Sequence, residues 1–197
     1  TAGGNDPSRT ELLINGSLIA EGTASEPIVI TSNASTPAAG DWGGIYQTGN
    51  GQLTLRHATI EYASLGVDYR VDGELTVSPT IENSTIRHST GHGLYLEGKG
   101  GANLTASIKN NAIDNHADDG VYLYATGTNT LVNATVTNNQ VYSNNRYGIY
   151  VYNLSATNNV QIVGNTVYNI TQSNSWGIYV NNGGNSPRLE IVNNTVY

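Results

Sequence analysis

The sequence predicts a right-handed parallel β-helix, an all-β solenoid whose coils of about 27 residues stack along one axis. Three observations lead to this prediction. A block of apolar and asparagine residues recurs through most of the chain. A glycine follows the successive copies at a nearly constant distance. The segments between these glycines alternate apolar and polar residues as short strands do, and none has a sustained helical period.

The repeat is clearest in the second half of the chain. Each full copy pairs a six-residue block such as Ile-Lys-Asn-Asn-Ala-Ile with a later Gly-Val-Tyr-Leu type segment. The four full copies occupy 81–86 with 93–96, 108–113 with 120–123, 136–141 with 148–151, and 162–167 with 177–180. A partial copy covers 191–196 and a diverged one covers 55–60 with Gly66. Successive glycines at 66, 93, 120, 148 and 177 are 27, 27, 28 and 29 residues apart.

Each repeat predicts a strand–turn–strand coil that buries its apolar face only against neighbouring coils. Asn-Asn pairs suit the turns, because asparagine tolerates left-handed backbone angles. We expect the asparagines at the fourth position of the six-residue blocks to form one column. We expect the repeat glycines to mark a sharp bend into the next strand. The column comprises Asn111, Asn139, Asn165 and Asn194. The expected inward side chains are Ile81, Ile86, Leu94, Leu96, Ile108, Ile113, Val121, Leu123, Val136, Val141, Ile149, Val151, Ile162, Val167, Ile178 and Val180.

Residues 1–197 read as one β-helix domain, with diverged first coils over 1–50 and regular repeats over 51–197. Solenoid ends normally need a cap, and residues 1–10 offer no amphipathic helix. Two explanations stay open. The chain is a section of a longer solenoid, or its ends are covered by like subunits in a head-to-tail assembly.

The composition favours an extracellular or cell-surface protein. The chain has no cysteine, 12% charged residues and a net charge of −7, which argues against nucleic acid as a partner. It has no apolar run long enough to insert into a membrane. Its 26 asparagines include eight Asn-x-Ser/Thr triplets, which are candidates for glycosylation. These begin at Asn15, Asn33, Asn83, Asn103, Asn133, Asn153, Asn169 and Asn193.

The Asn-Asn-x-Ile and Gly-Ile-Tyr-Val pattern resembles the repeat of the pectate-lyase-like superfamily of right-handed parallel β-helices. Segments 16–23, 27–32, 40–45 and 57–63 look like the first coils of its secreted microbial members. This resemblance implies the fold but no single function, because the superfamily includes lyases, hydrolases, epimerases, adhesins and structural spikes. Gly91-His92-Gly93 and Asp118-Asp119 resemble parts of the polygalacturonase motifs, but here they occur in the opposite order.

Alternation after each repeat glycine places a tyrosine on the outside of successive coils. The expected ladder is Tyr95, Tyr122, Tyr150 and Tyr179, extended by Tyr124 and Tyr152. Tyr142, Tyr168 and Tyr197 form a second, shorter ladder on another face. Such rows either stack to support strand pairing or provide a contact surface for carbohydrate or a neighbouring molecule.

The residues just before the repeat glycines form the candidate site. They are His92, Asp119, Tyr147 and Trp176, with Asp118 and Arg146 beside them. The four candidate catalytic residues are His92, Asp118, Asp119 and Arg146. The carboxylates could act as acid and base or hold Ca²⁺, the arginine could bind a uronate, and the aromatic rings could stack on sugars. The alternative is that these are ordinary turn residues. No motif requires a cofactor or fixes a metal site.

Three functions follow as hypotheses. The first is an extracellular structural or adhesive segment of a cell-surface or filament-forming protein. The second is a polysaccharide-active enzyme of the uronate lyase or epimerase type. The third is a carbohydrate-binding module. The expected partners are carbohydrate or like subunits. We expect His57 and His88 to be solvated strand or turn residues and Trp42 to cover an early coil.

Overall fold

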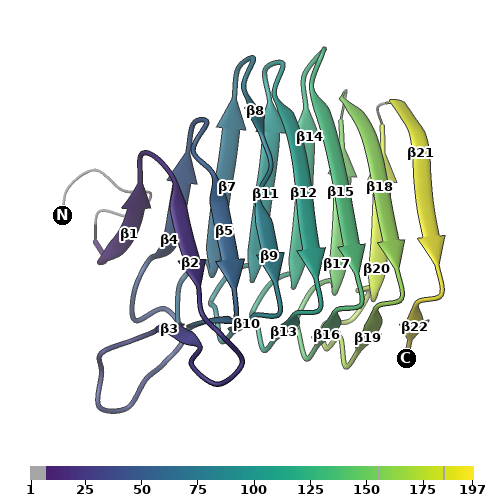
Figure 1. Cartoon of the computed structure of the whole chain (residues 1–197). Helices are drawn as coiled ribbons and strands as arrows, with labels where there is room; N and C mark the ends of the chain where they lie inside the picture. The colour runs from purple at the N-terminus through teal and green to yellow at the C-terminus, as the bar shows by residue number, and fades with distance from the viewer. Residues whose placement is uncertain (1–7, 155, 184) are drawn as a thin grey trace.

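The computed structural model describes residues 8–154, 156–183 and 185–197, and only the backbone of 185–187. Its strands form three parallel sheets that run side by side along the solenoid (Figure 1). The described N-terminal and C-terminal coils lie at opposite ends of the stack. The described residues contain no helix, and therefore none that could cross a membrane.

Sheet A carries the Gly-x-Tyr-x segments of the repeat. Its seven strands follow one another in the order in which the coils occur in the chain, and each is parallel to the next. Its register places Tyr122 opposite both Tyr95 and Tyr150, and Tyr150 opposite Tyr179. The strands are β1 (Glu11–Ile14), β4 (Gly44–Thr48), β7 (Val67–Asp72), β11 (Leu94–Lys99), β14 (Val121–Thr126), β17 (Ile149–Asn153) and β20 (Ile178–Asn182).

Sheet B carries the longest strands, and its outward residues are mainly hydroxyl and amide side chains. An additional strand, β8 (Thr76–Val77), pairs with the first residues of β12 (Asn103–Lys109), and β9 (Thr80–Glu82) pairs with its last three. The other strands are β2 (Leu18–Glu21), β5 (Leu53–Arg56), β9 (Thr80–Glu82), β12 (Asn103–Lys109), β15 (Leu131–Thr137), β18 (Thr157–Val163) and β21 (Asn185–Val192).

Sheet C is the narrowest of the three and carries the second half of each six-residue block. It joins sheet B through the Asn-Asn turns and leads on to sheet A. Its strands are β3 (Ile28–Ile30), β6 (Ala58–Glu61), β10 (Thr85–Arg87), β13 (Ala112–Asp114), β16 (Gln140–Tyr142), β19 (Thr166–Tyr168) and β22 (Thr195–Val196).

The core runs along the axis between the three sheets. Fourteen of the sixteen expected inward side chains are at most 2% exposed, which confirms the repeat phase. Ile178 and Val180 pack against this core but are only partly buried, and their strand β20 is at the edge of sheet A in the described part of the chain. Tyr69 is an unexpected core residue: it is fully buried and its hydroxyl donates to the carbonyl of Gly51 at 2.8 Å. Trp42 covers an early coil, as expected, with its indole N–H donating to Glu61 O.

The asparagine column forms as the sequence predicts. The side-chain oxygen of Asn139 accepts the backbone N–H of Asn111 at 2.9 Å, and Asn165 and Asn194 repeat this contact in the following coils. The preceding residue adopts a positive φ, as at Asn110 and Asn138 (both 56°). Each Asn-Asn pair therefore supplies one residue that tolerates the left-handed turn and one that satisfies buried backbone groups.

The repeat glycines have a role beyond the sharp bend expected of them, which is close packing between coils. None of them adopts a positive φ, so they do not supply a left-handed bend. A Cβ at Gly93 would lie 2.8 Å from Gly120 O, and one at Gly148 would lie 2.5 Å from Gly177 O. Glycine is required because successive coils approach too closely for any side chain at this position.

Candidate functional site

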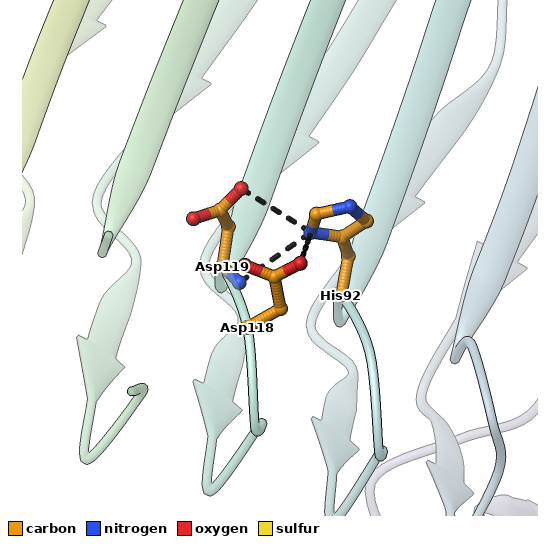
Figure 2. Close-up of side chains that lie close together, drawn as sticks. All are labelled: His92, Asp118 and Asp119. Carbon is orange, nitrogen blue, oxygen red and sulfur yellow. Dashed lines mark hydrogen bonds and ion pairs between the residues drawn. The ribbon is translucent and has the colours of Figure 1, made fainter. Parts of the chain in front are cut away.

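The ion-paired cluster consists of His92, Asp118, Asp119 and Arg146, and lies where chain segments enter sheet A. His92 precedes β11, the two aspartates precede β14, and Arg146 precedes β17. Parallel stacking brings these positions together although they are 26 or more residues apart in the chain, as the sequence predicted. Figure 2 shows His92 facing both aspartates from the neighbouring coil.

Arg146 binds both carboxylates. Its Nε and one Nη contact the two oxygens of Asp119 at 2.9 and 2.6 Å, and Nε also lies 2.9 Å from Asp118 Oδ1. The backbone N–H of Tyr147 donates to Asp119 at 3.1 Å. The Asp119 side chain is fully buried, so its charge is balanced inside the protein by this bidentate pair. Asp119 is therefore a positioning group rather than one that solvent or a polymer can reach.

His92 completes the cluster on its other side. Its Nδ1 lies 3.2 Å from Asp119 Oδ2 and 3.5 Å from Asp118 Oδ2. The imidazole also stacks on Tyr95, with ring centroids 5.6 Å apart, and meets Tyr122 edge-on at 5.1 Å. The side chain is 15% exposed, so it connects the ion pairs to the aromatic residues of sheet A.

Asp118 is the most accessible acid of the cluster, with 30% of its side chain exposed. Burial raises its pKa above the ordinary value, and the neighbouring Asp119 acts in the same direction, while His92 and Arg146 oppose the shift. The pKa of Arg146 is raised by its hydrogen bonds to Asp119, so its charge is fixed. The cluster therefore offers one carboxyl group with access to solvent, beside an imidazole.

A divalent cation would have to compete with Arg146. The ligand atoms of His92, Asp118 and Asp119 lie within 4.8 Å of one another. However, the guanidinium already contacts oxygens of both carboxylates, and Ca²⁺ requires six to eight oxygen ligands. The geometry favours Arg146 as the group that balances these charges.

The aromatic face consists of Tyr95, Tyr122, Tyr147, Tyr150, Trp176 and Tyr179, all on or just before sheet A. Tyr122 and Tyr150 stack with centroids 4.7 Å apart, and Tyr150 and Tyr179 stack at 5.2 Å. Tyr95 instead meets Tyr122 edge-on at 5.2 Å, so the face combines stacked and T-shaped ring pairs between neighbouring strands. Trp176 differs: it stacks on Tyr179 at 5.0 Å and on Tyr147 at 5.7 Å, yet remains 50% exposed.

The other ladders also form. Tyr124 stacks on Tyr152 at 5.7 Å on sheet A. On sheet C, Tyr168 stacks on Tyr142 at 4.9 Å and on Tyr197 at 5.2 Å.

Sequence reasoning missed a second arginine on this face. Asp68 takes the ladder position between Tyr46 and Tyr95, and Arg70 binds it through two bonds of 2.7 and 2.8 Å. The Arg70 guanidinium lies over Tyr95 at 5.0 Å and over Tyr46 at 5.8 Å. The Arg70 guanidinium therefore packs against the rings on both sides of Asp68, where the aromatic column has no ring of its own. The Asp-x-Arg spacing on an outward strand face was the signal available.

His116 was also missed, and it lies inside the turn beneath the cluster. Its Nδ1 accepts the N–H of Ser89 at 3.2 Å and its Nε2 lies 3.1 Å from Ile86 O. Burial lowers its pKa to about 3, so the imidazole is neutral. Asn144 occupies the same place one coil later, where its side chain accepts the backbone N–H of His116 and donates to Ile113 O. The signal was a histidine at the position where the next coil has Asn144, directly after a left-handed turn residue in both coils.

The remaining histidines lie at turns, as expected. His57 and His88 both adopt positive φ, and His88 stacks on Tyr62 at 5.1 Å.

The structure separates the glycosylation candidates by exposure. Five of the asparagines are exposed: Asn15, Asn33, Asn83, Asn169 and Asn193. Asn103 and Asn133 are half-buried. The prediction for Asn153 is wrong for the folded protein, because its side chain is fully buried and bonded to Ala156 and Asn182. A buried amide nitrogen cannot accept a glycan.

Comparison with known proteins agrees with the geometry. The family model described as "Right handed beta helix region" matches residues 10–136 and 43–197 in two overlapping alignments. Searches of curated proteins and of solved structures gave no significant match. Because the family model covers nearly the whole chain, the protein belongs to the right-handed β-helix family.

Proposed function

We propose that this chain is an extracellular adhesive segment of a cell-surface or filament-forming protein, and that it contacts carbohydrate through its aromatic face. The observation that carries the proposal is the continuous stack that runs from Tyr147 through Trp176 and Tyr179 to Tyr150, with the indole half exposed. An exposed tryptophan beside phenol hydroxyls supplies an apolar surface and a polar rim, which together suit a sugar ring.

Two further features support an adhesive role. The stacked coils and the buried asparagine column make a continuous scaffold that holds the aromatic side chains in register. Amides and hydroxyls cover the outer face of sheet B, and five asparagines of glycosylation triplets are exposed. Such a surface suits a protein that works outside the cell.

The enzyme hypothesis has one observation in its favour. Asp118 is partly exposed, has a raised pKa and faces His92, which is an arrangement that proton transfer can use. Against it, Arg146 is engaged by Asp118 and Asp119 and is not free to hold a uronate carboxylate. We therefore rank this function second. The test measures the absorbance of unsaturated ends released from uronate polymers, with and without Ca²⁺. Measurable release that Asp118→Asn abolishes would make the enzyme hypothesis the preferred one.

The adhesive function is tested by glycan retention. The purified chain is run in affinity gel electrophoresis against a panel of soluble polysaccharides, beside Trp176→Ala and the control Tyr168→Ala. Tyr168 has similar stacking contacts on sheet C, away from the proposed site. We expect Trp176→Ala to weaken binding about tenfold, the loss of one stacking anchor, and Tyr168→Ala to bind as the unmodified chain does. Equal retention of all three proteins, or no retention by any, refutes the proposal.

A further inference from the structure

The cations of sheet A are already neutralised, and this restricts the ligand. Between β7 and β17 the face carries three of them, and each contacts a carboxylate of the same face. Arg70 binds Asp68, Lys99 lies 3.4 Å from Asp72, and Arg146 binds Asp119. The pairs of Arg70 and Arg146 are bidentate, so the donors that recognise carboxylates are in use.

The carboxylates of this face outnumber its cations. Glu97 and Asp118 add two more acids to the three that are paired, so five carboxylates face three cations and leave a formal charge of −2. The whole chain carries a net charge of −7, so the overall charge of the molecule has the same sign as that of this face.

The two arginines are also covered by rings. Arg146 lies over Tyr147 at 5.1 Å and over Tyr150 at 5.5 Å, and Arg70 lies over Tyr95 at 5.0 Å. A guanidinium that is held by a carboxylate and packed on aromatic rings cannot turn to meet an anionic ligand without breaking both contacts.

The phenol hydroxyls remain available. Among the described residues, the hydroxyls of Tyr95, Tyr122, Tyr150 and Tyr179 make no hydrogen bond within the chain, unlike that of Tyr69. Burial raises the pKa of Tyr150 to about 12, and also raises the pKa values of Tyr95 and Tyr122. These groups are neutral donors and acceptors, which match the hydroxyls of an uncharged sugar.

We infer that the glycan recognised by the aromatic face is neutral and that acidic, uronate-type polymers are disfavoured. This inference rests on the proposed glycan-binding function and specifies its ligand class. Asp118 shares the single charge of Arg146 with Asp119, so the pair of acids keeps a net negative charge. Each ligand carboxylate about 7 Å from this charge is expected to weaken binding about threefold to eightfold at low salt. When several uronates of one polymer lie along the face, the losses of affinity for each carboxylate multiply.

The test uses two forms of one polymer. Homogalacturonan is offered as the free acid and as the fully methyl-esterified form, together with neutral xylan, mannan and glucan, in affinity electrophoresis at about 20 mM salt. We expect at least one neutral polymer to bind. We expect the ester to be retained at least tenfold more strongly than the acid, and this gap to narrow at about 0.5 M salt, where charges are screened.

Charge variants separate the outcomes further. Asp118→Asn leaves the Arg146–Asp119 pair in place and should raise affinity for the acid form several-fold without changing binding of the ester. Glu26→Gln removes the same charge from an exposed loop residue and should change neither. Free acid bound as tightly as the ester, with or without Ca²⁺, overturns the inference but leaves the adhesive function standing. Absence of binding to every polymer overturns both.

Discussion

Replacing His116 by asparagine should make the protein less sensitive to acid. The imidazole is fully buried and its pKa is lowered to about 3, chiefly by burial. Below about pH 6.5 the unfolded chain binds a proton at this residue and the folded chain does not. The free energy of unfolding therefore falls by about 1.4 kcal/mol per pH unit between pH 6.5 and pH 3, and by about 2 kcal/mol at pH 5.

Asparagine is the matched substitution because Asn144 already occupies this place in the next coil. Its side-chain oxygen accepts the backbone N–H of His116 at 3.1 Å, and its Nδ2 donates to Ile113 O at 3.3 Å. Ile113 lies opposite Ile86, so the new amide can replace both contacts of His116. The smaller side chain leaves a small cavity that costs about 1 kcal/mol, and this cost does not depend on pH.

Urea unfolding of the unmodified chain and His116→Asn at pH 8, 7, 6 and 5 tests this reasoning. The difference between the two free energies should be constant from pH 8 to pH 7. It should then shift by about 2 kcal/mol in favour of the variant by pH 5, and other titrating groups cancel because both proteins contain them. A constant difference from pH 8 to pH 5 would refute the conclusion that the fold holds His116 neutral.

Three further predictions concern the scaffold. Asn139→Ala leaves the buried N–H of Asn111 without an acceptor and should cost about 2–3 kcal/mol in urea unfolding; Asn133→Ala, on the outer face, should cost under about 1 kcal/mol. Gly120→Ala places a methyl group 2.8 Å from Gly148 O and should lower the free energy of unfolding by about 1–3 kcal/mol. Gly16→Ala, which has open space around it, should change the melting temperature little. Equal effects of the two variants would contradict the close approach of coils. In a glycosylating host, peptide mass spectrometry should find glycan at exposed Asn33 but none at buried Asn153.

Much of the fold follows from the repeat because stacking converts spacing in the chain into position in space. Residues 27 to 29 positions apart, such as Tyr122 and Tyr150, become neighbours across two parallel strands. The same rule brings His92 beside Asp119 and Asp119 beside Arg146. Columns are therefore predictable from one sequence, without knowledge of any individual contact.

The contacts within a column are less predictable. Asp119 and Asp118 are adjacent identical residues, yet one is fully buried and the other 30% exposed. Alternation along a strand does not settle this, because both precede the strand and their side-chain directions depend on the turn. The charge state of His116 likewise depends on burial that only the complete coil provides.

The sequence by itself determined the solenoid, its core, its asparagine column and the side of the coil on which a site would lie, because each depends only on period and alternation. Tertiary structure alone decided that the repeat glycines serve close approach and that Arg146 is bound by its own carboxylates. The physical reason is that these outcomes depend on distances of a few ångströms between coils. A repeat pattern specifies which residues meet but not how their side chains share space and charge.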